Sequence, residues 1–172
     1  AAISFHMTAI IPIILFGITY FTQRIPLIYF VIIFTIALLL SYANFGIKNL
    51  SPFFVDLLEG DKRASYLQDK QTHYQIGFKP QFALFNTIFL IIFLYINHYI
   101  RIKPYNQLLK YYILTSSLFF MAFQLSFSDR WGLFSWFAIP LLILPIYKYN
   151  NKLIIKPSFF TLFLIFVFIF FN

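Results

Sequence analysis

Long apolar runs separated by short polar turns constrain this chain more than any other feature of its sequence. About 20 consecutive apolar residues form a helix that crosses the ~30 Å hydrocarbon core of a bilayer. Charged residues make up only 10% of the chain, whereas soluble domains carry about 25%. The sequence therefore predicts an all-α, polytopic integral membrane protein. The predicted spans are Ile3–Tyr20, Leu27–Tyr42, Phe82–Ile100, Gln107–Phe127, Leu133–Tyr147 and the short Phe159–Phe171.

We expect residues 1–172 to form a single transmembrane domain of about six helices. The chain opens inside an apolar run and has neither an initiator Met nor a basic leader. We therefore expect it to be the C-terminal part of a longer membrane protein. Pro26 and Pro80 suit the first turns of the second and third spans, and Pro140 and Pro145 predict a kinked fifth span.

The polar stretch between the second and third spans, residues 44–80, is too long for a simple connector. Ser51-Pro52 predicts the start of a short amphipathic helix over residues 52–58, and Gly60 predicts its end. Asp61 predicts the cap of a second short helix. The stretch is therefore expected to be a long outer loop that carries short helices.

Charges are distributed unevenly between the two faces of the predicted bundle. One set of loops contains no acidic residue and receives Arg24, Arg101, Lys103, Lys110, Lys148, Lys152 and Lys156. The other side receives all five acidic residues and six basic ones, namely Lys48, Lys62, Arg63, Lys70, Lys79 and Arg130. These charges lie mostly in one long loop, which has less influence on orientation than short loops. Short loops rich in Lys and Arg mark the cytoplasm, so we expect the long loop and the turn at Ser128-Asp129 to be extracytoplasmic.

Three of the predicted spans begin at the outer face close to a basic side chain, namely His6, Lys79 and Arg130. The N-terminus of a helix carries partial positive charge and free N–H groups, so a bound anion is favourable there. This arrangement predicts a phosphate or diphosphate site. The alternative is that Lys79 and Arg130 extend their side chains to the phosphates of membrane lipids.

Arg130 is the strongest candidate because its planar guanidinium binds a phosphate through two parallel hydrogen bonds. Asp129 is a second candidate catalytic residue, although the N-cap of the fifth span is a more ordinary role for it. His6 is a candidate base, but a single histidine in an apolar helix is more often structural.

Three further polar side chains lie in the predicted outer loop, namely Arg63, Tyr66 and His73. They suit a surface that binds carbohydrate, and a solvated loop explains them equally well. The sequence has no metal-ligand spacing, no glycine-rich phosphate loop and no nucleophile elbow, and it contains no cysteine. No metal or other cofactor is therefore predicted, and thiol chemistry is excluded.

Three short motifs follow one another in the chain. They are Ser4-Phe5-His6-Met7-Thr8-Ala9 before an apolar span, Ile76-Gly77-Phe78 at the end of the long loop, and Ser128-Asp129-Arg130-Trp131-Gly132-Leu133-Phe134 before an aromatic helix. Their order resembles bacterial Wzy-type polysaccharide polymerases, especially the EpsG-like group. The likeness covers nearly all of this chain but only part of a typical member, whose N-terminal spans are missing here. It implies roles for His6, Arg130 and Gly77.

Such polymerases join lipid-diphosphate-linked oligosaccharide units at the outer face of the plasma membrane. The resemblance implies a multi-pass glycosyltransferase of the bacterial inner membrane, active in exopolysaccharide or O-antigen synthesis. Arg130 would bind the departing diphosphate, and a carboxylate or histidine would take the proton of the acceptor hydroxyl. The expected partners are the lipid-linked oligosaccharide, membrane lipids and a chain-length regulator or flippase, with no nucleic acid.

A non-catalytic flippase or transporter of the same lipid-linked oligosaccharide is the alternative. A transporter is expected to carry ionisable residues near the bilayer midplane and internal repeats. Lys110 is counted with the basic loops although it falls near the start of the span Gln107–Phe127; no other charged residue falls within a predicted span, and no repeat is found. A membrane acyltransferase would need an acid beside its histidine, which His6 lacks in sequence. The sequence therefore favours an enzyme that works at one face of the membrane.

Overall fold

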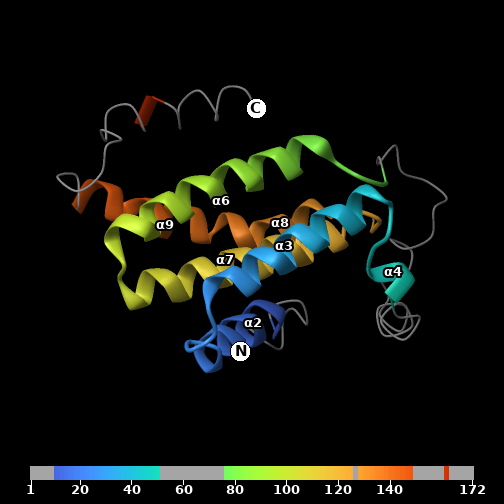
Figure 1. Ribbon diagram of the computed structural model, residues 1–172. Helices are drawn as coiled ribbons and strands as arrows, with labels where there is room; N and C mark the ends of the chain where they lie inside the picture. Colours follow the sequence, from blue (N-terminus) through green and yellow to red (C-terminus); the bar gives the residue numbers. More distant parts are fainter. Residues whose placement is uncertain (1–9, 51–75, 126–127, 149–160, 163–172) are drawn as a thin grey trace.

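All regular structure is α-helical in the part of the chain that the computed structural model describes, residues 10–50, 76–125, 128–148 and 161–162 (Figure 1). In chain order, the helices are α2 (Ile10–Phe21), α3 (Leu27–Tyr42), α4 (Ile47–Leu50), α6 (Pro80–Ile100), α7 (Lys103–Met121), α8 (Asp129–Trp136) and α9 (Ala138–Lys148). The predicted all-α class is confirmed for these residues.

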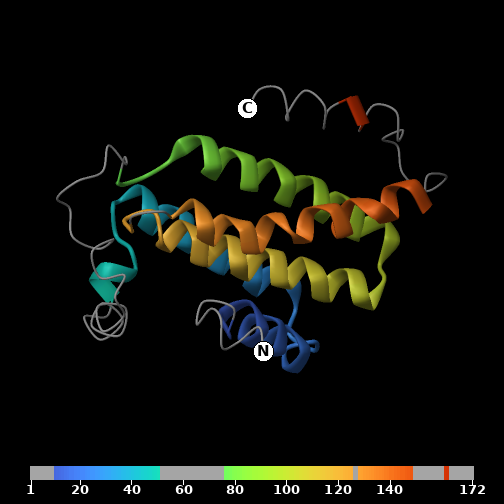
Figure 2. The same ribbon diagram turned by 180° about the vertical axis from the view of Figure 1, so that it is seen from behind.

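The longer helices lie side by side in a bundle that has α7 at its centre (Figures 1 and 2). α7 packs against α2, α3, α6, α8 and α9. The chain reverses direction between successive long helices, so α3 and α7 end where α6 and α8 begin. This end of the bundle, formed by residues 76–79, 121–125 and 128–131, is called the α8 end below.

Prolines set the starts of helices at the predicted places. α3 occupies its predicted range directly after Pro26, which has φ −57° and ψ 143°. Pro80 lies in the first turn of α6, where a missing N–H removes no helical hydrogen bond. α7 begins earlier than predicted because Pro104 also suits a first turn, and it ends earlier because residues 122–125 form turns.

The predicted fifth span is divided into α8 and α9 at Phe137. Pro140 has no N–H to donate to the carbonyl of Trp136, and its ring crowds that carbonyl. The helix is therefore interrupted one turn before Pro140, which confirms the predicted distortion. Pro145 lies inside α9.

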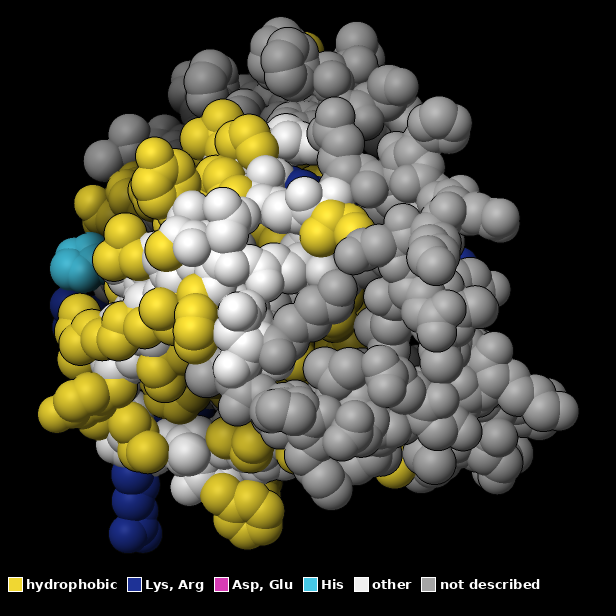
Figure 3. Space-filling view, turned by 90° about the vertical axis from the view of Figure 1, so that its right-hand side faces the viewer, with side chains coloured by type: hydrophobic (Ala, Val, Ile, Leu, Met, Phe, Trp, Pro, Cys, Tyr) yellow, Lys and Arg dark blue, Asp and Glu magenta, His cyan; other side chains and the backbone are white. Residues whose placement is uncertain are grey.

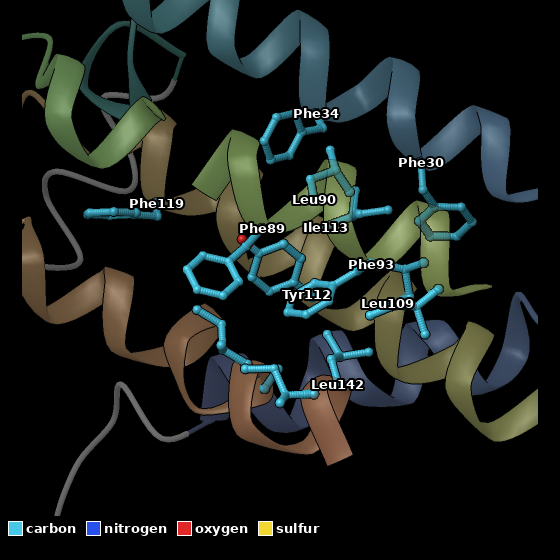
Figure 4. Close-up of a cluster of buried hydrophobic side chains, with 14 of the residues drawn as sticks. Phe30, Phe34, Phe89, Leu90, Phe93, Leu109, Tyr112, Ile113, Phe119 and Leu142 are labelled. Carbon is cyan, nitrogen blue, oxygen red and sulfur yellow. The ribbon is translucent and has the colours of Figure 1, made fainter. Parts of the chain in front are cut away.

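A core of aromatic and branched apolar side chains joins the helices (Figure 4). Those labelled in the close-up come from α3, α6, α7 and α9: Phe30, Phe34, Phe89, Leu90, Phe93, Leu109, Tyr112, Ile113, Phe119 and Leu142. Rings meet edge to face, for example Phe34 with Phe120 at a centroid separation of 5.0 Å. Such a contact adds about 0.5–1.5 kcal/mol to the burial of the rings.

The outer faces of the helices are apolar as well. Ile28 and Leu39 on α3, and Leu84 and Ile91 on α6, are 58–62% exposed. A helix that is apolar on all sides suits a lipid environment better than water. Among the described residues, α6 is the one helix long and apolar enough to cross a membrane, while α2 and α3 are apolar but shorter.

Lys110 corrects the assignment of charges made from sequence. The prediction placed it with the loops, but it lies inside α7 with only 2% of its surface exposed. Its Nζ donates hydrogen bonds to the carbonyl oxygens of Thr22, Gln23 and Ile25, at 2.9, 3.2 and 2.7 Å. Nζ also lies 5.1 Å from the centre of the Phe30 ring. The ammonium thus holds the turn between α2 and α3.

Several predictions concern residues outside the described part of the chain. They are the candidate site residues His6, Arg63, Tyr66 and His73, the loop helix over residues 52–58, and nearly all of the last apolar run, residues 159–171. The arrangement of six spans stays a prediction.

Candidate functional site

The α8 end brings together three residues that were selected from sequence, Lys79, Asp129 and Arg130. Lys79 directly precedes α6, and the other two open α8. Figure 3 views the molecule from this end, and the described side chains that it shows are mostly hydrophobic or uncharged, with Lys and Arg in a few places. Two cationic side chains and one carboxylate therefore lie at the starts of two helices, α6 and α8.

Lys79 and Ser128 join the starts of α6 and α8. Nζ of Lys79 donates a hydrogen bond of 2.8 Å to Oγ of Ser128, although 49 positions separate the two residues in sequence. Both are buried, with 9% of Lys79 and 0% of Ser128 exposed. Lys79 has an extended backbone, with φ −113° and ψ 91°, as expected for a residue before proline. The Lys79-Pro80 pair thus starts α6 and presents the ammonium to α8.

The surroundings of the Lys79 ammonium act on its charge in opposite directions. Burial lowers the pKa of Lys79, and the negative charge of Asp129 raises it in part. Nζ also lies 5.9 Å from the centre of the Phe82 ring, within the range of cation–π attraction. Asp129 is therefore close enough to Lys79 for the two charges to interact.

Asp129 occupies the first turn of α8 and not the N-cap position that the sequence suggested. The N-cap is Ser128, with φ −56° and ψ −26°, and its side chain caps none of the described N–H groups. The turn is closed by a backbone bond of 2.9 Å from N of Trp131 to O of Ser128. The N-cap prediction is wrong by one residue, yet a carboxylate in the first turn still interacts favourably with the helix dipole.

Arg130 follows Asp129 in the same turn, and its side chain is exposed. Successive helical side chains point roughly 100° apart around the axis, so these two residues present different faces of α8. The guanidinium of Arg130 is therefore accessible to a ligand at the surface of the α8 end. Whether Lys79, Asp129 and Arg130 bind substrate stays a prediction.

Gly77 fixes the approach of the chain to Lys79. It has φ +122°, a region that glycine adopts far more readily than other residues. Its N–H donates to the carbonyl of Phe123, 3.1 Å away, just beyond the end of α7. The next residue, Phe78, makes ring contacts with Tyr42 and Phe123 at centroid separations of 5.4 and 6.1 Å. The glycine of the family-like motif thus ties the start of α6 to the end of α7.

Gly132 lets α8 lie close against α7. A Cβ at this position would lie 2.9 Å from Cζ of Phe119 and 3.0 Å from Cζ2 of Trp136. Phe119 is fully buried, so its ring has little room to move away. The position of α8 therefore depends on the absence of a side chain two residues after Arg130.

A buried polar cluster that was not predicted from the sequence lies among α6, α7 and α8. Oδ1 of Asn86 accepts hydrogen bonds from the hydroxyls of Tyr112, Ser116 and Ser135, at 3.3, 3.1 and 3.3 Å. Nδ2 of Asn86 donates to the carbonyl of Phe82 at 2.9 Å. Polar groups in apolar helices commonly satisfy one another across helices. The available signal was Asn86 itself, a polar residue inside the predicted span Phe82–Ile100.

The chemistry open to the α8 end follows from its donors. The described residues include no group of three or more His, Asp or Glu side chains that could hold a metal ion. Lys79 and Arg130 supply cationic nitrogen donors, the first turns of α6 and α8 supply N–H groups, and Asp129 supplies a carboxylate. Such a set suits the recognition of an anion and the stabilisation of a developing negative charge.

Comparison with known proteins gives one positive result. A family model described as the EpsG family matches residues 1–172, the whole length of the chain. No curated protein and no solved structure matches it. The match includes every described helix and the α8 end.

Proposed function

Because the chain belongs to the EpsG family, we propose that it is a polysaccharide polymerase that works at the outer face of the bacterial plasma membrane. Family membership supports a polymerase-like role in exopolysaccharide biosynthesis and an association with the membrane. In this proposal the substrate is an oligosaccharide linked through a diphosphate to a lipid carrier.

The proposed reaction transfers a glycosyl group. The oxygen of an acceptor sugar hydroxyl forms a bond with the anomeric carbon of the donor, and the bond between that carbon and the diphosphate oxygen breaks. The bonding electrons leave with the diphosphate, and the hydroxyl proton passes to a base. Negative charge therefore develops on the diphosphate as the bond breaks, and a fixed cation there lowers the barrier.

The position of Arg130 carries this proposal. It is an exposed arginine in the first turn of α8, where the helix dipole also favours an anion. A guanidinium binds two oxygens of a phosphate at once, which an ammonium cannot do. Arg130 is thus the group that we assign to the departing diphosphate.

The other candidate residues have supporting roles in the proposal. Asp129 and His6 are the candidates for the base, since a carboxylate or a neutral imidazole accepts a proton. Lys79 and the outer-loop residues Arg63, Tyr66 and His73 are candidates for binding the substrate. An alternative function, transport of the same lipid-linked oligosaccharide, would use an ionisable group inside the bundle. Lys110 is such a group, but its three donors are occupied by backbone carbonyls, which favours a structural role.

Substitution of Arg130 in the full-length protein tests the proposal. Arg130→Lys keeps the charge and removes the two-pronged geometry, and Arg130→Ala removes both. We expect each to lower the polymerisation rate about a hundredfold or more, because a donor to the developing charge is lost. A lower polymerisation rate should appear as shorter polymer in cells. The amount of the protein in the membrane is measured in the same cells, to exclude a loss of expression. Arg24→Lys, at an exposed arginine of the α2–α3 turn, is the matched control and should leave polymer length unchanged.

Two results would count against this assignment. Normal polymer in both Arg130 variants would remove Arg130 from the mechanism. A severe defect in Asp129→Asn with normal polymer in Arg130→Lys would move the catalytic role to the carboxylate. If the protein is instead a transporter, the Arg130 variants should have less lipid-linked oligosaccharide at the outer face. The polymer that they still make should then be of normal length.

A further inference from the structure

Lys79 contacts α8 from within the bundle, whereas Arg130 lies on the exposed side of that helix. We propose that Lys79 is a positioning residue, which holds the first turn of α8 through Ser128 and so sets where Asp129 and Arg130 lie. The consequence for polymerisation rests on the proposed function. The positioning is a property of the fold and is tested separately.

α8 depends on outside contacts because it is short. Its 8 residues extend over about 12 Å, and isolated helices of fewer than about 12–15 residues are marginal in stability. The break at Phe137 separates it from α9. The orientation of α8 is therefore set by the groups that pack against it.

Different contacts hold different turns of α8. The later turns are held where Gly132 meets α7 and where Oγ of Ser135 lies 3.3 Å from Oδ1 of Asn86. The first turn is held at Ser128 by Lys79, through the hydrogen bond of 2.8 Å. Because α8 is a single helix of only 8 residues, loss of the lysine contact should loosen the turn that carries Asp129 and Arg130 and let the whole helix, Ser135 included, move away from α7 more often.

The hydrogen bonding of the Ser128 hydroxyl supports the assignment of Lys79 as a positioning residue. An N-cap serine ordinarily accepts a hydrogen bond from an N–H of its own helix, but Ser128 forms none with the described part of α8 and accepts from Lys79. A cation beside a helix N-terminus opposes the helix dipole, and a buried charge is costly unless it is hydrogen-bonded. The Ser128 hydroxyl and the charge of Asp129 offset part of these costs at Lys79.

The chain offers a matched control for Lys79. A second Lys-Pro pair, Lys103-Pro104, opens α7, and the side chain of Lys103 is exposed. Lys79→Met and Lys103→Met therefore remove the same charge from the same dipeptide at the start of a helix. Only the first substitution removes a contact with α8.

A buried cysteine reports on the position of α8. Ser135 is fully buried, and the chain contains no cysteine, so Ser135→Cys introduces one protected thiol. The rate of its modification by N-ethylmaleimide is measured in membranes that contain the full-length protein. We expect Lys79→Met and Ser128→Ala each to raise this rate about tenfold, because a buried charge-assisted hydrogen bond is lost. The two together should raise it no further than either alone, and Lys103→Met should leave it unchanged.

Each other result has a definite meaning. Unchanged modification in Lys79→Met and Ser128→Ala would overturn the inference, and so would a rise in Lys79→Met that Ser128→Ala does not reproduce. Shortened polymer in Lys79→Met with unchanged modification would overturn it in favour of direct contact with substrate. Failure of the proposed function would instead show as normal polymer in the Arg130 variants, whatever the modification rates are.

Discussion

Nζ of Lys110 lies 2.7 Å from the carbonyl oxygen of Ile25, a residue 85 positions away in sequence. Thr22 and Gln23 supply two more carbonyl acceptors, so the three protons of the ammonium have three acceptors. The lysine thus connects the central helix α7 to the α2–α3 turn. A buried charge in this bundle therefore serves the packing of helices.

Lys110→Met is expected to destabilise the protein by about 2 kcal/mol, because carbonyl groups lose a charged donor. Methionine keeps the length and the apolar stem of the side chain, so packing changes little. Thermal unfolding of the detergent-solubilised protein measures the effect, with the exposed Lys103→Met as control. An unchanged melting temperature in Lys110→Met would mean that water serves these carbonyls as well as the ammonium does.

The two asparagines of α6 should respond in opposite ways to replacement by leucine. Asn86→Leu removes the acceptor of the buried Ser116 hydroxyl, whereas Tyr112 and Ser135 keep bonds of 2.9 Å to the backbone carbonyls of Asn86 and Gly132. We therefore expect a loss of about 1–3 kcal/mol. Oδ1 of Asn97 is buried and accepts no hydrogen bond from any described residue, so Asn97→Leu should be neutral or stabilising. Thermal unfolding compares the two variants. Equal destabilisation of Asn86→Leu and Asn97→Leu would contradict the prediction, because it would mean that the hydrogen bonds of Asn86 contribute no specific stability.

Gly132 and Gly17 form a second matched pair, compared by thermal unfolding. Gly132→Ala places a methyl group 2.9 Å from the Phe119 ring, and we expect this overpacking to cost about 1–3 kcal/mol. Gly17 lies inside α2, and a methyl group there would have no neighbour within 4 Å. Gly17→Ala should therefore stabilise by about 0.5–1 kcal/mol through helix propensity. Stabilisation by both substitutions would contradict the close packing of α8 on α7.

Features fixed by local chemistry were predictable from the sequence. Pro26 and Pro80 each remove a donor and restrict φ, so they indicated the starts of α3 and α6. Pro140 indicated a distortion, which the structure shows as the break at Phe137. A long apolar run indicated α6, which is the one helix among the described residues that is long and apolar enough to cross a membrane.

Features fixed by distant contacts were not predictable in this way. The bond from Lys79 to Ser128 depends on how α6 packs beside α8, and no local pattern encodes a pairing across 49 positions. Lys79 and Asp129 were chosen from the sequence because they are charged, not because a contact between them was foreseen. The sequence suggested Asp129 as the N-cap of its helix, but the N-cap is Ser128 and Asp129 is the first helical residue. Lys110 was counted with the basic loops although it falls within the predicted span Gln107–Phe127. The carbonyls that accept its hydrogen bonds belong to another segment, so the sequence around Lys110 does not reveal them.

The last prediction concerns which face of the membrane the α8 end occupies. Gln81, at the start of α6, and Lys103, at the start of α7, are both exposed and lie at opposite ends of the bundle. The chain contains no cysteine, so Gln81→Cys and Lys103→Cys each introduce a single thiol. Short loops rich in Lys and Arg are expected on the cytoplasmic side, so the α8 end, which lies opposite them, is expected to be outside. We therefore expect an impermeant thiol reagent to modify Gln81→Cys in intact cells and Lys103→Cys only after permeabilisation.

The reverse pattern would place the α8 end in the cytoplasm. Arg130 could not then act on a substrate at the outer face, and the proposed location of polymerisation would be wrong even if Arg130 proved essential. Modification of both thiols in intact cells would mean that the two ends of the bundle do not face opposite sides of a membrane. Since both side chains are exposed, a failure of either to react cannot be attributed to burial within the described structure, and the labelling pattern reports the side of the membrane.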